Sequence, residues 1–257
     1  YRSVRGNPPQ YDDSAAELVG LNVDVIVTDN APATRAAFDA TDKIPIVGLD
    51  FTNDPVAAGY VQSYARPGGN LTGFFLDAPT FSFKWVELLK ELMPGLSRVA
   101  VLFDPAPGAV HLEAVQAATE HFGIAVRVIN VHRPADLEPA FLTLRGWPQA
   151  LIILPSPMLW ARSERLAELT MKYKLPATSM APPFAKAGGF LSYGPDQTEA
   201  WERSASLVAK ILRGAKPGQL PVERPTNFRL SVNQKTAEAL DIIIPQSIVL
   251  RADQVIR

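Results

Sequence analysis

The stretch VDVIVTDNAPAT, residues 23–34, places residues that could bind a ligand at the end of a predicted strand. The apolar run predicts a buried strand, and Thr28, Asp29 and Asn30 follow it directly, before a segment of helical composition. A helix start needs one capping side chain, which Asn30 ahead of Pro32 supplies. Two further polar residues at the same place favour a site for a small polar ligand.

Polar, aromatic or sulfur-containing residues also follow other predicted strands. Ligands of open α/β sheets bind beyond the carboxyl ends of the strands, so these positions form the candidate binding set. At the predicted helix start, Asn30, Ala31 and the next N–H groups would take a carboxylate, and Asp29 or Asp54 would take an ammonium. Capping alone is the alternative for any single position. The ligand-binding residues that we expect are Thr28, Asp29, Asn30, Ala31, Asp54 and Phe75 from the first block of the chain, and Ser156, Met158, Met180 and Tyr193 from the second.

The sequence contains few of the residue patterns that are typical of enzymes. The chain has no cysteine and no GxSxG nucleophile motif, and the spacing of His111, His121 and His132 matches no metal motif, so we predict surface roles for these histidines. No GxxxxGK[ST] or GxGxxG sequence follows a strand, and the glycine pairs 68–69 and 188–189 are expected to form turns. We therefore predict no catalytic residues, no metal, no cofactor and no enzymatic activity.

Composition narrows the class of protein further. The 257 residues carry a net charge of −1 without a basic block, which argues against a nucleic-acid partner. Hydrophobic residues make up 47% of the chain, enough for a large core in one or two domains. No apolar run approaches 18 residues, so the sequence predicts no membrane span.

The elements that must position these residues alternate between short β-branched runs and amphipathic segments of helical length. This alternation predicts an α/β protein with parallel sheets. In the first block we expect strands at 1–4, 23–28, 44–50 and 71–76, and helices that include a short one at 53–65. In the second we expect strands at 98–104, 124–131, 150–155, 175–180, 190–194 and 228–233. The run SIVLRADQVI, residues 247–256, is expected to be extended.

Several stretches together resemble the ABC-transporter substrate-binding proteins of the family that includes tryptophan- and tyrosine-binding lipoproteins. They include NDPVAAGYVQSYARPGGNLTG, KWVELLKELMPGLSRVAVLFDP, AGGFLSYGPD and ILRGAKPGQLPVERPTNFRLSVNQKTAEAL. The resemblance covers essentially the whole chain. It implies a type I periplasmic binding fold, in which two Rossmann-like lobes with parallel sheets are joined by a hinge and close on a small solute.

The resemblance also sets the expected domains and function. We expect residues 1–76 and about 196–227 in the N-terminal lobe and 80–194 in the C-terminal lobe, with 228–257 forming a hinge-crossing strand and a C-terminal segment. The expected function is solute binding for an ABC importer. The expected ligand is an amino acid or related carboxylate, with aromatic amino acids among the candidates, the expected partner is a membrane permease, and the expected location is periplasmic or extracytoplasmic. The alternative is a ligand-sensing or interaction domain of the same fold that is not coupled to transport.

The start of the chain leads to one more expectation. Family members begin with a signal segment, a first strand and a first helix, whereas this chain opens at what resembles the second strand. An N-lobe without its central strand would leave backbone groups unpaired, at about 1–3 kcal/mol for each buried group. We therefore expect either a strand upstream of Tyr1 or a rearranged N-lobe, for example in a homodimer.

Overall fold

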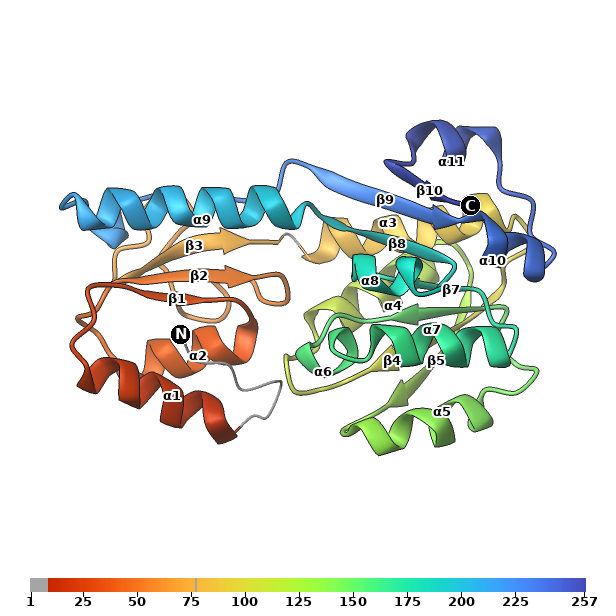
Figure 1. Ribbon diagram of the computed structural model, residues 1–257, viewed down its shortest axis with the longest axis horizontal. Coiled ribbons are helices and arrows are strands. Elements are labelled where there is room, and N and C mark those ends of the chain that lie inside the picture. Colours follow the sequence, from red (N-terminus) through yellow and green to blue (C-terminus); the bar gives the residue numbers. More distant parts are fainter. Residues whose placement is uncertain (1–8, 77) are drawn as a thin grey trace. The chain divides into compact units, whose positions relative to one another are not determined.

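The computed structural model describes residues 9–76 and 78–257 (Figure 1). The chain divides into two compact units, unit 1 within Tyr1–Ala78 and Asp196–Asn227, and unit 2 formed by Pro79–Pro195 and Phe228–Arg257. Each unit is a sheet covered by helices, so the α/β class predicted from the alternating pattern is confirmed. The strand expected at residues 1–4 lies outside the described residues.

Unit 1 has a three-stranded parallel sheet in the order β1-β2-β3. Glu223 extends the sheet through an isolated parallel bridge to Phe74. The elements are α1 (Pro9–Gly20), β1 (Ile26–Thr28), α2 (Ala31–Ala40), β2 (Ile46–Asp50), β3 (Leu71–Phe75), α9 (Gln197–Leu212) and the 3-10 turn η2 (Pro217–Gln219). The sheet is thus built from segments that lie more than 140 residues apart in the chain.

Both faces of β2 and β3 are buried, which explains why these two strands are mostly apolar rather than alternating. On one face Ile46 and Leu71 pack with Ala37 of α2. On the other face Val47 packs with the buried residues Leu207 and Ile211 of α9. Figure 1 shows α9 on one side of this sheet and α1 and α2 on the other.

One glycine is required by the pairing of β2 with β3. Gly73 lies opposite Gly48 in the register and has a φ of +153°. A Cβ atom on Gly73 would lie 1.9 Å from the carbonyl oxygen of Gly48, so no side chain fits without moving the backbone. The Gly73 carbonyl accepts a hydrogen bond from the Glu223 amide at 2.8 Å, which ties the returning segment to β3.

Unit 2 has a seven-stranded sheet in the order β10-β9-β8-β7-β6-β4-β5. All neighbouring strands are parallel except β8 and β9, which are antiparallel. The strands are β4 (Arg98–Phe103), β5 (Ala125–Asn130), β6 (Ala150–Ile153), β7 (Ala177–Ser179), β8 (Leu191–Pro195), β9 (Phe228–Asn233) and β10 (Gln254–Ile256). The helices are α3 (Ala78–Leu92), α4 (Val110–His121), α5 (Leu137–Thr143), α6 (Pro157–Trp160), α7 (Ser163–Lys172), α8 (Pro182–Lys186), α10 (Gln234–Ala239) and α11 (Gln246–Arg251), with a 3-10 turn η1 (Pro134–Asp136).

The strand order of unit 2 reverses beside β4. The chain passes from β4 to β5 on one side and then returns to β6 on the other side of β4. Such a reversal sends the following connections to opposite faces, which opens a crevice at the carboxyl ends of the two strands. Asp104 follows β4 and Ser156 follows β6 closely, so these residues lie at the switch point of the sheet.

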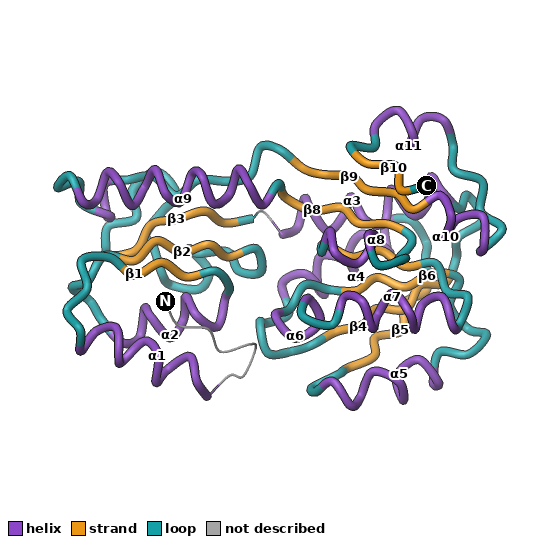
Figure 2. Tube along the Cα trace, viewed as in Figure 1, coloured by secondary structure: helices purple, strands orange, loops and turns teal. Residues whose placement is uncertain are grey.

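Two local predictions were wrong (Figure 2). Residues 53–65 form turns rather than a helix, because the Asp54 carboxylate caps a tight turn and Gly59 adopts a φ of +75°. Residues 247–256 are not extended throughout, since α11 occupies Gln246–Arg251 before β10 begins. In α11 only Ile248 is fully buried, a spacing that suits a single helical turn lying on the core.

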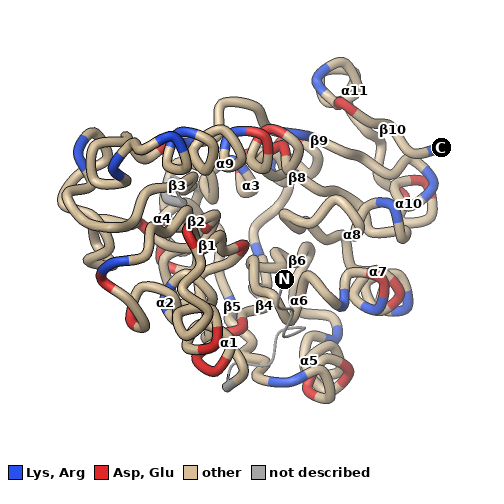
Figure 3. Tube along the Cα trace, turned by 60° about the vertical axis from the view of Figure 1, so that its left-hand side comes forward, with Lys and Arg blue, Asp and Glu red and all other residues tan. Residues whose placement is uncertain are grey.

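Charges of both signs are interspersed over the helices of each unit (Figure 3). α9 carries Glu199, Glu202, Arg203 and Lys210, and Arg203 forms ion pairs with Glu199 and Glu223. Within residues 9–76 and 78–257, no helix combines the length and the apolar composition that crossing a membrane requires.

Candidate functional site

The start of α2 is organised by the polar run that follows β1. Asn30 is the N-cap, and its side-chain oxygen accepts a hydrogen bond from the Ala33 amide at 2.9 Å. This fixes the orientation of the Asn30 side chain, whose amide nitrogen donates to Asp29 Oδ1 at 2.7 Å. The hydroxyl groups of Thr28 and Thr34 are hydrogen-bonded at 2.7 Å beneath this turn. The Thr34 hydroxyl is also within hydrogen-bond distance of the Asn30 carbonyl, at 2.9 Å, so the four polar residues form one connected network.

Few donors at the start of α2 remain for a ligand. The Ala33 amide is capped by Asn30, the Thr34 amide bonds the Asn30 carbonyl at 2.9 Å, and Pro32 has no N–H group. Among the described residues, the Ala31 amide has no hydrogen-bond partner. Asn30 donates one of its two side-chain N–H groups to Asp29, so it could offer only the other to a carboxylate.

Asp29 keeps an exposed surface at the edge of unit 1. Crowding by protein atoms nevertheless removes water from its carboxyl, and this desolvation raises its pKa against the opposing hydrogen bonds from its own amide and from Asn30. Tyr11 of α1 lies nearby, since burial and the charge of Asp29 both raise the pKa of its phenol, while a hydrogen bond with Asn30 lowers it. Sequence reasoning missed Tyr11 because its segment has no strand-end pattern.

The end of β2 holds a fully buried carboxylate. Asp50 accepts hydrogen bonds from the Thr52 amide at 2.7 Å, the Thr52 hydroxyl at 2.7 Å, the Asn53 side chain at 2.9 Å and the Asn53 amide at 3.3 Å. Burial raises the pKa of Asp50 although these bonds oppose the shift. Burial and then the charge of Asp50 raise the pKa of Tyr60 to about 12. Asp50 therefore fixes the conformation of the loop that follows β2 through its hydrogen bonds with Thr52 and Asn53.

Two predicted residues of unit 1 have structural contacts of their own. Asp54 is partly exposed and accepts from the amides of Val56 at 2.7 Å and Ala57 at 3.1 Å, so it caps the turn that follows. Phe75 is fully buried in the core, with its ring centroid 6.5 Å from that of Tyr60. In this conformation the side chain of Phe75 contacts the core rather than solvent.

In unit 2 the switch point presents a second capped helix start. Ser156 is buried and its Oγ accepts from the Leu159 amide at 3.0 Å, with Pro157 in the first turn of α6. Among the described residues, the Ser156 O–H and the Met158 N–H have no acceptor. The Met158 side chain packs at the edge of the core of unit 2. Asp104, at the neighbouring strand end, is buried and accepts from the Ala106 amide at 3.1 Å.

Met180 and Tyr193 lie farther along the sheet of unit 2. Met180 is only 2% exposed and its backbone and side chain lie against Gly194, where an added Cβ would meet the Met180 carbonyl oxygen at 2.6 Å. Tyr193 is half-buried in a stack with Phe81 and Phe228, with ring centroids 5.3 and 5.7 Å from its own. Trp85 donates its indole N–H to the Tyr193 carbonyl at 3.0 Å. The aromatic partners of Tyr193 come from distant segments, and sequence reasoning did not find them.

The histidines divide into one buried and two exposed residues. His121 and His132 are exposed, as predicted. The surface role predicted for His111 was wrong: this residue is 4% exposed and its Nδ1 is hydrogen-bonded to the Ser82 hydroxyl at 2.7 Å. Within the part of the chain that the structure describes, no three His, Asp or Glu side chains gather in a way that could hold a metal ion.

The sequence-predicted residues thus have several different roles. Tyr193 lies in an aromatic stack of unit 2. Thr28, Asp29 and Asn30 belong to one hydrogen-bonded network in unit 1, where Ala31 begins α2, and Ser156 and Met158 lie at a second helix start in unit 2. Both helix starts have a capping side chain followed within two residues by proline, and both leave one backbone N–H for a ligand. Phe75 and Met180 are core residues in this conformation, and Asp54 caps a turn.

Comparison with known proteins identifies the family. A profile of the ABC transporter substrate binding protein family matches residues 1–256. The chain belongs to this family. The fold and the family inferred from the sequence motifs are confirmed.

Individual relatives agree with this assignment. A tyrosine-binding protein of Clostridioides difficile is 22% identical over 246 residues, which cover 94% of this chain and 70% of that protein. A crystal structure of a conserved domain protein from Vibrio cholerae has a TM-score of 0.92 at 29% identity, and the match covers 99% of this chain and 86% of that one. The structure of an ABC domain in complex with L-Trp from Streptococcus pneumonia has a TM-score of 0.89 at 24% identity, covering 98% and 85%.

Proposed function

We propose that this chain is the solute-binding component of an ABC importer and that its solute is an amino acid or a related carboxylate. Family membership over residues 1–256 is the observation that supports the role most strongly. An aromatic amino acid is favoured because relatives are described as tyrosine-binding or were crystallised with L-Trp. A membrane permease as partner and an extracytoplasmic location follow from the same proposal.

The strand-end residues of each unit are proposed to supply groups suited to one part of such a solute. In unit 1 the exposed Asp29 carboxylate, held by Asn30, is suited to accept from the ammonium group of an amino acid. In unit 2 the Ser156 hydroxyl and the Met158 amide are donors suited to a carboxylate. Tyr193 and its stacked neighbours supply aromatic surface for the side chain of the solute.

This assignment changes one role expected from the sequence. The start of α2 was expected to take the carboxylate, yet its capping side chain and most of its amides are already used within the protein. We therefore propose that unit 1 binds the ammonium group. The remaining Ala31 amide contributes one hydrogen bond.

The test is calorimetric titration with L-tyrosine, tyramine and 3-(4-hydroxyphenyl)propionate, which separate the ammonium from the carboxylate contribution. We expect L-tyrosine to bind and Asp29→Asn to weaken it about tenfold or more, since a hydrogen bond to a charged group contributes about 1.5–3 kcal/mol. Asp24→Asn removes an exposed carboxylate of the same unit and is the matched control. Equal binding of L-tyrosine by both variants would contradict the role of Asp29, and no binding of any amino acid would contradict the solute class. Mass spectrometry of the solute that co-purifies with the wild-type chain identifies the natural ligand directly.

A further inference from the structure

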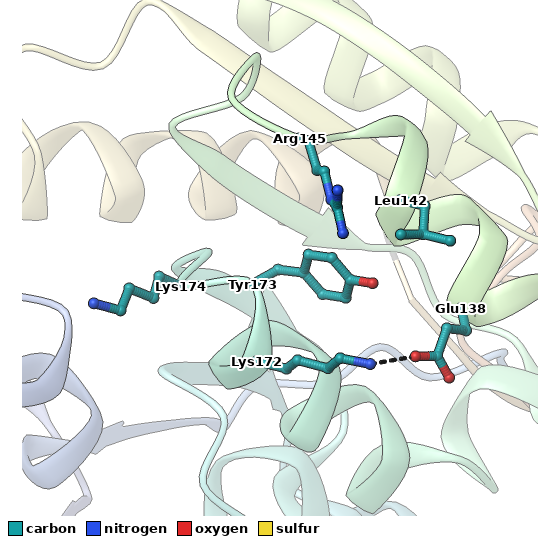
Figure 4. A pocket seen from close by; sticks show the side chains of 6 residues that line it. All are labelled: Glu138, Leu142, Arg145, Lys172, Tyr173 and Lys174. Atoms are coloured by element: carbon teal, nitrogen blue, oxygen red, sulfur yellow. Dashed lines mark hydrogen bonds and ion pairs between the residues drawn. The ribbon is translucent and has the colours of Figure 1, made fainter.

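A cavity of about 520 Å³ lies in unit 2 between the ends of α5 and α7 (Figure 4). Its lining residues are Glu138, Leu142, Arg145, Lys172, Tyr173 and Lys174. Both helices end just before a strand begins, β6 after α5 and β7 after α7. The cavity therefore lies at the amino-terminal edge of the sheet, the edge opposite the strand ends discussed above. Its volume is in the range of pockets that bind small molecules.

The base of this cavity is aromatic and apolar. Tyr173 is half-buried and packs on Phe141, with ring centroids 5.7 Å apart. Leu142 is 46% exposed beside it. An exposed leucine next to a ring offers apolar surface that a flat ligand would remove from water, at about 25 cal/mol for each Å² covered.

The acidic residue of the cavity is already neutralised. Glu138 forms ion pairs with Lys172 and with Arg165, the latter at 2.6 Å. Hydrogen bonding and charge from Lys172, with Arg165 adding to them, hold the pKa of Glu138 below its ordinary value. The negative charge of Glu138 is therefore already compensated by two cations, which weakens its attraction for the ammonium group of a ligand.

Two cations of the cavity have no such partner. Among the described residues, neither Arg145 nor Lys174 has an ion-pair or hydrogen-bond partner for its side chain. Figure 4 shows the Arg145 side chain pointing toward the Tyr173 ring and Leu142, whereas the Lys174 side chain extends away from them. Arg145 thus directs a planar, five-donor group toward the apolar base, while the Lys172 ammonium lies 5.5 Å from the centre of the Tyr173 ring.

Helix dipoles explain part of this arrangement, because cations are favoured at helix carboxyl ends. Lys172 and Lys174 at the end of α7 fit that account. It does not explain why Arg145 points toward a ring and an exposed leucine of the same depression. A guanidinium group directed toward apolar and aromatic surface can bind a carboxylate carried on a flat apolar body.

We propose that this cavity binds an aromatic carboxylate that lacks an ammonium group. Arg145 would hold the carboxylate by paired hydrogen bonds, and the Tyr173 ring and Leu142 would cover the apolar body. An amino acid is disfavoured because its ammonium group would lie beside the Arg145 guanidinium, and the acidic residue of the cavity, Glu138, is already ion-paired. This site is separate from the strand-end residues, so it stands independently of the proposed transport function.

The experiment is a two-dimensional amide NMR titration of the full chain with benzoate, benzylamine and cyclohexylmethanol as probes. Benzoate is expected to shift the amide resonances of residues 138–146 and 171–175 and to bind with a Kd in the millimolar range. A tenfold change in Kd corresponds to about 1.4 kcal/mol of binding free energy. Arg145→Gln should weaken benzoate about tenfold, and Tyr173→Leu should weaken it less. Arg162→Gln removes an exposed arginine of the same unit outside the cavity and should leave binding unchanged. Thermal melts of each variant verify that it is folded.

Three outcomes would overturn the proposal. Benzylamine that binds as well as benzoate would show that charge sign does not matter there. Equal weakening by Arg145→Gln and Arg162→Gln would reduce the effect to net charge. Shifts confined to residues 28–31 and 156–158 would place benzoate at the strand ends instead, a result that would leave the proposed function intact.

Discussion

Replacing Asp50 by alanine should destabilise unit 1 more than any other single carboxylate change at its strand ends. The carboxylate of Asp50 is fully buried and accepts four hydrogen bonds from Thr52 and Asn53. The Asp50→Ala variant keeps the donors and removes their acceptor. Removing one partner of a buried hydrogen bond costs more than the bond itself contributes, because the other group stays desolvated.

The expected loss of stability in Asp50→Ala depends on which of the four donors can form a hydrogen bond to water instead. The Thr52 hydroxyl and the Asn53 side chain lie in partly exposed residues and can turn outward. The two backbone N–H groups are fixed by the turn and cannot reorient, and each donor left without its partner costs about 1–3 kcal/mol, which gives about 2–6 kcal/mol for Asp50→Ala. Asp54→Ala is the matched control. It also removes the acceptor of two backbone amides, but at a partly exposed turn, so we expect a loss of at most about 1 kcal/mol.

The Asp50→Asn variant tests how stability depends on pH, and the direction of the expected change is fixed by the pKa of Asp50. Burial raises the pKa of Asp50 in the folded chain above its ordinary value, so the folded state binds the proton more tightly than the unfolded state does. The stability of the wild type relative to Asp50→Asn is therefore greatest below the ordinary aspartate pKa of about 3.8 and is lost as pH rises through the raised pKa. The asparagine side chain keeps one acceptor oxygen and does not titrate.

The assay is hydrogen exchange of the amides in β2 and β3, with urea unfolding followed by circular dichroism at several pH values. Exchange confines the measurement to unit 1, where the Leu76 amide donates to the Asp50 carbonyl at 3.2 Å. Two results would refute the reasoning. One is an Asp50→Ala loss no greater than that of Asp54→Ala. The other is a difference between wild type and Asp50→Asn that grows in favour of the wild type as pH rises.

Three further predictions concern local geometry. Asn30→Ala should cost about 1 kcal/mol of stability and raise the pKa of Asp29, whereas Asn30→Ser should restore the cap but leave that pKa raised. NMR titration measures the pKa, and an Asp29 pKa that is unchanged in Asn30→Ala would contradict the hydrogen bond between the two side chains. Gly73→Ala should destabilise unit 1 by more than about 3 kcal/mol, since its Cβ would lie 1.9 Å from a carbonyl oxygen, while Gly69→Ala, with open space around it, should be nearly neutral in thermal melts. Ser156→Ala should cost about 1–2 kcal/mol by urea unfolding because the cap of α6 is buried, and Ser156→Asn should recover most of it; equal losses would argue against capping.

The local features of the chain follow from the sequence alone. Asn30 and Ser156 are N-caps because a short polar side chain before a proline-containing helix start bonds an amide three residues ahead. The strand predicted at 228–233 is β9, since its apolar and β-branched composition suits a sheet. The interactions that decide such features span only a few residues. The fold as a whole was predicted from the resemblance of longer motifs to a known family.

Burial and long-range partners were decided only by the tertiary structure. Phe75 is the last residue of β3 and Met180 follows β7, yet neighbouring elements cover both side chains, and a linear pattern does not say which elements those are. His111 is buried, and the partner that satisfies its Nδ1, Ser82, lies 29 positions away in the chain. Thr72 donates to the Leu220 carbonyl across 148 positions, which places the returning segment beside β3. Such contacts depend on how sheets and helices pack, and packing is a property of the whole chain rather than of any stretch within it.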